Sequence, residues 1–196
     1  MLFNYTSGLK DTFDRKGAYL PGQIAKSGWK LAPSLNTLST GPRIEFGQVV
    51  KRATTDAGLP YATSFAGGET AKDIYGIAIR DVVSQSQADY GAFQVAYIYN
   101  YFPGQPVSIL REGYICVPVQ NGTPTVGGQV YVRIAANGAN PNLPIGGIET
   151  AEVEGETIAY PGATFESGAY FPMNGTSVTP TAEVATSQCA TILILQ

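Results

Sequence analysis

The amino-acid sequence predicts a mainly β fold, a compact antiparallel β-barrel or β-sandwich domain that follows an extended, largely irregular N-terminal arm. Three observations favour it. The 196 residues include 23 glycines and 13 prolines, which interrupt helices and mark turns. Charged residues make up only 14% of the chain, against roughly 25% in an average soluble domain, while 44% are apolar. After residue 44, short apolar runs bounded by turn residues recur, as is typical of sandwiches and barrels.

The predicted arm comprises residues 1–43. Glycine and proline recur at short intervals from Gly17 to Pro42, and neither a helical nor a strand period is sustained. Fully extended, such an arm reaches on the order of 140 Å. It is too apolar for a flexible tail, so we expect its side chains to seek a surface on this subunit or a neighbour. The candidate contact residues in the arm are Phe3, Tyr5, Lys10, Phe13, Arg15, Lys16, Tyr19 and Trp29.

The predicted β domain comprises residues 44–196, with loop excursions at about 135–148 and 168–186. The run 74–80 is its first clear strand. In the next run, 92–102, period-two alternation places an aromatic ladder on one face. The ladder favours cross-strand packing or a contact between subunits, and a platform that stacks sugars or bases is the alternative. Its candidate contact residues are Tyr97, Tyr99 and Tyr101.

A β-hairpin is predicted over residues 107–119, with a turn at 111–113 in which Gly113 permits a positive φ. Because Pro118 lacks an N–H, the return strand should lie at a sheet edge or carry a bulge. Three further strands are expected at 129–134, at 158–165, which a Pro-Gly bend interrupts, and at 189–195. The last is almost continuously apolar, so we expect it to be buried between neighbouring strands.

The charges are distributed unevenly along the chain. Residues 1–52 carry eight basic and three acidic side chains, and no basic residue follows Arg133. Such asymmetry favours pairing with further copies of the chain or with a charged assembly surface, and an ordinary solvated surface is the alternative. Cys116 and Cys189 form no CxxC pair and lie in apolar runs, which predicts two buried reduced thiols, although a disulfide between them is geometrically possible. No signal peptide and no membrane span are expected.

The sequence offers little to catalysis. Histidine is absent, which removes the most common general base and metal ligand. Glu152, Glu154 and Glu156 have the spacing that would place three carboxylates on one strand face, for a cation or for glycoside hydrolysis, but a solvated acidic edge is the simpler interpretation. The glycine pairs lack the context of a phosphate-binding loop, and the β region is too acidic for nucleic acid. We therefore expect no metal, no cofactor and no nucleic-acid partner.

Several segments occur in the order found in a known family. They are YGIAIR at 75–80, PVSILREGYICVPV at 106–119, GGQVYVR at 127–133 and YPGATF at 160–165, with weaker similarity at 19–25 and 45–50. Together they span the chain from about residue 19 to its C-terminus, and in this order they resemble the structural cement or head-decoration proteins of tailed bacteriophages.

This resemblance implies a largely β, non-enzymatic virion protein that binds the outer surface of a capsid and cements neighbouring capsomers. Its partners would be the major capsid protein and copies of itself, as a homotrimer or alternatively a homodimer, with no nucleic acid or membrane. It would be present in the host cytoplasm during assembly. The candidate contact residues of the arm and the ladder would then touch the capsid or a neighbouring subunit. The alternatives are a carbohydrate-binding or adhesive β module on the virion surface, and a hydrolase that uses the Glu152–Glu156 carboxylates.

Overall fold

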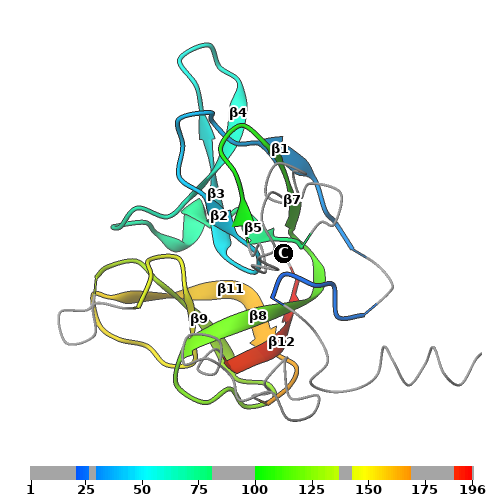
Figure 1. Cartoon of the computed structure of the whole chain (residues 1–196). Coiled ribbons are helices and arrows are strands. Elements are labelled where there is room, and N and C mark those ends of the chain that lie inside the picture. The colour runs from blue at the N-terminus through cyan, green and yellow to red at the C-terminus, as the bar shows by residue number, and fades with distance from the viewer. Residues whose placement is uncertain (1–20, 27–29, 81–99, 137–142, 169–187, 196) are drawn as a thin grey trace, which may run out of the picture.

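The computed structural model of the chain describes residues 21–26, 30–80, 100–136, 143–168 and 188–195. In these ranges the protein is nearly all β and consists of two bodies, a closed barrel and a curved sheet, that lie against each other (Figure 1). The single helical element among the described residues is the short 3₁₀ turn η1 (Ala71–Asp73), and no helix in this part could span a membrane. The predicted fold class is confirmed.

The barrel has five strands in the order β10, β8, β12, β11 and β9, and it closes because β9 pairs with β10. All pairs are antiparallel except β10 with β8. β12 lies between β8 and β11, with Ile192 and Ile194 fully buried, which confirms the burial predicted for the last apolar run. The bounds are Gly113–Asn121 for β8, Gln129–Arg133 for β9, Ile148–Glu149 for β10, Thr157–Phe165 for β11 and Gln188–Ile194 for β12.

The sheet has five strands in the order β1, β7, β5, β3 and β4. Its two edges approach each other through a bridge between Thr37 and Ala62, so the sheet curls around its own small core. A two-stranded sheet of β2 and β6 contributes Ile44 and Tyr101 to this second core. The bounds are Ser34–Asn36 for β1, Ile44–Glu45 for β2, Val49–Thr54 for β3, Pro60–Ser64 for β4, Gly76–Ala78 for β5, Asn100–Tyr101 for β6 and Pro106–Leu110 for β7.

A larger hydrophobic core joins the two bodies. It contains the inward side chains of the barrel, such as Ile115, Val117 and Ile192, together with Val49 and Leu110 from the sheet. Alternate residues of β8 point into this core, as the pleat of a strand requires. Because this core draws apolar side chains from both bodies, the barrel and the sheet are packed together, although the sheet also has the small second core of its own.

The predicted hairpin over 107–119 is wrong. β7 pairs with β1 and β5 in the sheet, whereas β8 pairs with β10 and β12 in the barrel. At the connection, the carbonyl of Leu31 accepts the N–H of Arg111 at 2.8 Å, and the N–H of Leu31 donates to the carbonyl of Glu112 at 3.1 Å. The backbone groups that a hairpin would pair locally are thus taken by a distant segment, and the chain passes from one body to the other.

The described part of the predicted arm includes a paired segment, residues 22–25 and 31–36, which we call the strap. The strap runs antiparallel to the continuous segment 106–116, and its last three residues are β1. At the barrel, the N–H of Gly22 donates to the carbonyl of Cys116 at 2.8 Å. The strap therefore has main-chain bonds to both bodies and ties the barrel to the sheet.

Two irregularities in the barrel occur close to a proline or glycine singled out in the sequence. β8 is not an edge strand, as one interpretation of Pro118 predicted, because β12 pairs with it from Gly113 to Val119. On its other side Pro118 falls between two partners, since the strap pairs before it and β10 pairs from Val119 onward, where the register then shifts. β11 bends at Gly162, where φ is 71° and the register with β9 shifts, which confirms the predicted interruption. A Cβ at Gly162 would collide with the carbonyl of Leu195.

The two cysteines are buried and are not joined by a disulfide bond. Cys116 of β8 and Cys189 of β12 form a small apolar cluster with Ala25 of the strap. The predicted pair of buried reduced thiols is confirmed.

Candidate docking surface

No group of three or more acidic, histidine or cysteine side chains in the described part of the chain is arranged to hold a metal ion. The Glu152–Glu156 series does not lie on a strand, which corrects the carboxylate face considered from the sequence. Gly155, with φ at 72°, turns the chain just before β11. Glu152 and Glu154 are exposed there, whereas Glu156 pairs with Arg133. The turn therefore does not present the paired carboxylates that a glycosidase requires.

Arg133 of β9 is a fully buried cation. It forms an ion pair with Glu149 of β10, which is 1% exposed, and its Nη1 donates to Glu156 at 2.7 Å. Burial alone would lower the pKa of Arg133, but the hydrogen bonds to Glu149 and Glu156 outweigh it and raise the pKa. This cluster connects two barrel strands to the turn before β11, so its role is structural.

Glu69 is a second buried carboxylate with a structural role. It accepts the ammonium of Lys51 at 2.6 Å and the N–H groups of Ala66 and Gly67 at 2.8 Å each. Burial alone would raise the pKa of Glu69, but the bond from Lys51 and then those from the two backbone N–H groups lower it overall. The loop at 66–69 is thereby fixed to β3.

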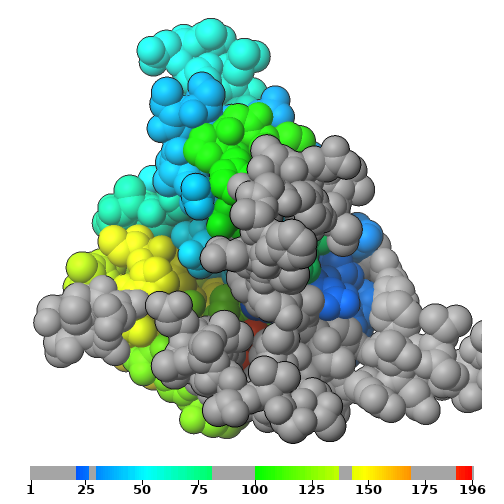
Figure 2. Space-filling view, viewed as in Figure 1, coloured from blue at the N-terminus to red at the C-terminus, as the bar shows by residue number. Residues whose placement is uncertain are grey.

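The hairpin of β3 and β4 projects from the sheet, and Figure 2 shows its tip as a separate protrusion at the top of the molecule. Leu59 at this tip is 65% exposed. The tip is held by bonds between Thr55 and Leu59: the N–H of Thr55 donates to the Leu59 carbonyl at 2.9 Å, and the N–H of Leu59 donates to Thr55 Oγ1 at 3.1 Å. A single exposed leucine is common on protein surfaces, but at the tip of a projecting hairpin it is accessible to a partner.

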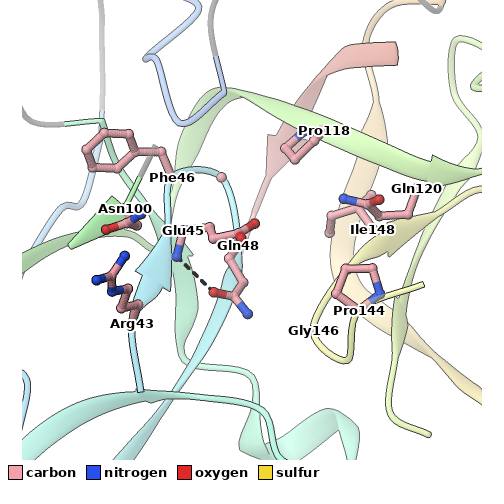
Figure 3. A pocket seen from close by; sticks show the side chains of 12 residues that line it. Arg43, Glu45, Phe46, Gln48, Asn100, Pro118, Gln120, Pro144, Gly146 and Ile148 are labelled. Atoms are coloured by element: carbon pink, nitrogen blue, oxygen red, sulfur yellow. Dashed lines mark hydrogen bonds between the residues drawn. The ribbon is translucent and has the colours of Figure 1, made fainter. Parts of the chain in front are cut away.

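A hollow of about 260 Å³ lies between the β2–β6 sheet and the barrel (Figure 3). Arg43, Glu45 and Asn100 line it from the side of β2 and β6, and Gln120 and Pro144 from the side of the barrel. The buried Oδ1 of Asn100 has no hydrogen-bond donor among the described residues. The hollow therefore offers a cation, an anion and an unsatisfied acceptor in one place, which suits a polar side chain of a partner.

Of the predicted contact residues, only Tyr101 lies in the described part. Its ring packs edge-on against Phe46 with the centroids 5.1 Å apart, and its hydroxyl donates to the carbonyl of Ile79 at 2.5 Å. Because Tyr101 is fully buried, it is a packing residue of the second core, which agrees with the cross-strand packing favoured for the ladder and not with a stacking platform or a subunit contact at this position. The residues outside the described part are Phe3, Tyr5, Lys10, Phe13, Arg15, Lys16, Tyr19, Trp29, Tyr97 and Tyr99.

The sequence did not indicate which apolar residues are exposed. Four large apolar side chains are exposed in the described ranges: Leu31, Leu59, Val126 and Leu195. For Leu59 and Val126 a signal was available, because each adjoins a glycine in a turn. For Leu31 and Leu195 the sequence carried no such signal, since their exposure depends on strands that are distant in sequence.

Comparisons with known proteins identify a family and a similar fold. A family model described as structural cement protein (E217 gp24/Pam3 gp6) matches residues 10–187. A chain in the solved structure described as the capsid of Myoviridae phage XM1 has a similar fold, with a TM-score of 0.58 and 15% identity over 99% of this chain and 98% of that one. No curated protein matches the sequence.

Proposed function

Because the chain belongs to the phage family of structural cement proteins, we propose that it is a non-enzymatic virion protein that binds the outer surface of the capsid and stabilises neighbouring capsomers. The observation that carries the proposal is the family match over residues 10–187, which includes every described strand of both bodies except β12. The fold is consistent with this role, since the buried charged side chains of the described residues, Glu69, Arg133 and Glu149, are in structural pairs.

In this proposal the partners are the major capsid protein and further copies of the chain, three around a local three-fold position or two around a two-fold position. A cement protein meets a repeating lattice, so many weak contacts together give strong attachment. The hairpin tip at Leu59 and the hollow at Asn100 supply two contacts of different chemistry, one apolar and one polar.

The N-terminal arm supplies the long-range contact of the proposal, docking on the capsid or on an adjacent copy. Residues 1–20 reach roughly 65 Å from Pro21 when extended, which is enough to cross a neighbouring subunit. The strap supports this assignment, because it anchors the base of the arm to both β bodies by main-chain hydrogen bonds. Tension on the arm would therefore reach the folded body without first unravelling an unpaired linker.

Removal of residues 2–20 tests the proposal. The strap must be kept, since a deletion through residue 43 would also remove β1 and leave 106–116 without one of its neighbouring strands. We expect the shortened chain to lose most of its co-sedimentation with capsid shells that lack the protein, while its melting temperature stays close to that of the full chain. Full retention of shell binding would refute the role of the arm, and failure of the full chain itself to bind shells would refute the proposed function.

A further inference from the structure

Two of the four exposed leucine and valine side chains in the described ranges lie on either side of one residue, Glu112. The strap residue Leu31 pairs with Glu112 in an antiparallel bridge. On the other side of β8, Ile194 lies opposite Gly113, and extending this register by one residue places Leu195 beside Glu112. Directly opposed residues of antiparallel strands point to the same face, so Leu31, Glu112 and Leu195 form one row on the outer face of the barrel.

A second row continues this surface. Tyr114 lies opposite Leu193 on β12, and both are partly exposed. Lys26 covers the Tyr114 ring, with its ammonium 4.1 Å from the ring centroid and 3.9 Å from a carboxylate oxygen of Glu166. We call the four apolar residues Leu31, Tyr114, Leu193 and Leu195 the seam patch. In Figure 1 the strap, the β7–β8 connection and the end of β12 meet there, beside the C-terminus.

The charges around the seam patch are balanced. Lys26 and Lys30 supply two exposed cations, and Glu112 and Glu166 supply two partly exposed anions. A patch that carries both signs around an apolar centre is complementary to itself, because a two-fold rotation can bring the cations of one copy to the anions of the other. An apolar centre within a charged rim is also the usual anatomy of a protein interface.

We propose that the seam patch is the contact between two copies of this chain and that the two copies are related by a two-fold axis. The proposal deepens the proposed function, since it places the association of copies on one described surface and favours two copies over three. Leu59 and Val126 are more exposed, at 65% and 73%, but each lies alone in a turn, and no second exposed large apolar side chain of the described residues pairs with either in the strand register. Val126 serves as the control.

The test measures the mass of the full chain by sedimentation across a concentration series. The wild-type protein is expected to reach the mass of two chains. Leu31→Asp combined with Leu195→Asp should weaken self-association by roughly a hundredfold or more, because each change enters a two-fold interface twice. Val126→Asp, which places the same charge on a side chain that is 73% exposed, should leave it unchanged.

A second pair of variants changes only exposed charges, so that any loss of self-association cannot be attributed to misfolding. Lys30→Glu alters only an exposed rim charge and should weaken the dimer in a salt-dependent way, whereas Lys72→Glu, a change at an exposed lysine of η1, should not. A monomeric wild type, a mass of three chains, or a dimer that persists in the Leu31→Asp, Leu195→Asp variant would each overturn the proposal. Capsid co-sedimentation, measured separately, tests the proposed function. A wild-type dimer that fails to bind shells would refute the proposed function but would still support the dimer contact.

Discussion

Replacing Tyr101 with phenylalanine removes one hydroxyl from the second core and leaves the ring in place. That hydroxyl donates a 2.5 Å bond to the carbonyl of Ile79, and both residues are buried. Leaving a buried carbonyl without this donor costs about 1–3 kcal/mol. The edge-on contact with Phe46 is retained by phenylalanine. We therefore expect the free energy of unfolding to fall by about 1–3 kcal/mol for Tyr101→Phe, and by about 3–5 kcal/mol for Tyr101→Ala, which also empties the space of the ring.

Urea titration followed by circular dichroism measures both variants against the wild type, with an unchanged slope showing that the same surface is exposed on unfolding. Shell binding is measured on the same preparations. A packing role requires that stability falls in the stated order while binding per folded molecule is unchanged. The reasoning is refuted if Tyr101→Phe unfolds at the wild-type urea concentration, or if Tyr101→Ala is as stable as the wild type but no longer binds shells.

Three further outcomes are expected. The pKa of Glu69 is lowered in the folded state, so the stability that its ionised form contributes is present above its ordinary pKa of 4.5 and is lost as the pH falls through the lowered pKa. Glu69→Gln should therefore lower the free energy of unfolding by about 1–3 kcal/mol at neutral pH. In melts at acid pH the difference from the wild type should vanish. Arg133→Met leaves Glu149 buried without its cation and should cost about 3–5 kcal/mol, much of it recovered by also changing Glu149 to leucine, as urea titration can show. Gly162→Ala and Gly155→Ala both strain a positive φ by about 1–2 kcal/mol, but only the former collides with the Leu195 carbonyl, so its melting temperature should fall further; equal losses would contradict that contact.

The fold class and several strands could be predicted because they depend on local pattern. Alternation identified β9 and the return strand β8, an almost continuous apolar run identified the terminal β12, and a Pro-Gly pair marked the bend at Gly162 in β11. The predicted hairpin failed because local pattern does not show which partner a strand takes. The turn residues at 111–113 are consistent with a hairpin, yet the strap, some eighty residues earlier, supplies the bonds instead.

The candidate surface could be predicted less well, since exposure is decided by tertiary packing. The alternating pattern placed Tyr101 on a ladder but could not show that this position turns into the second core. In the sequence, Arg133 is notable only as the last basic residue, whereas its burial between two carboxylates depends on the pairing of β9 with β10. Leu195 belongs to a run whose other members are mostly buried, so only the register with β8 reveals it at the surface.

The antiparallel strap also determines how the molecule would carry a mechanical load. A pull on Pro21 directed along the strap acts across hydrogen bonds that lie perpendicular to it, so the bonds to the barrel and those to β7 are sheared together rather than opened one at a time. A pull at right angles to the strap would instead peel them in sequence. Resistance to an outward force from a swelling shell would therefore depend on the angle at which the arm leaves the folded body.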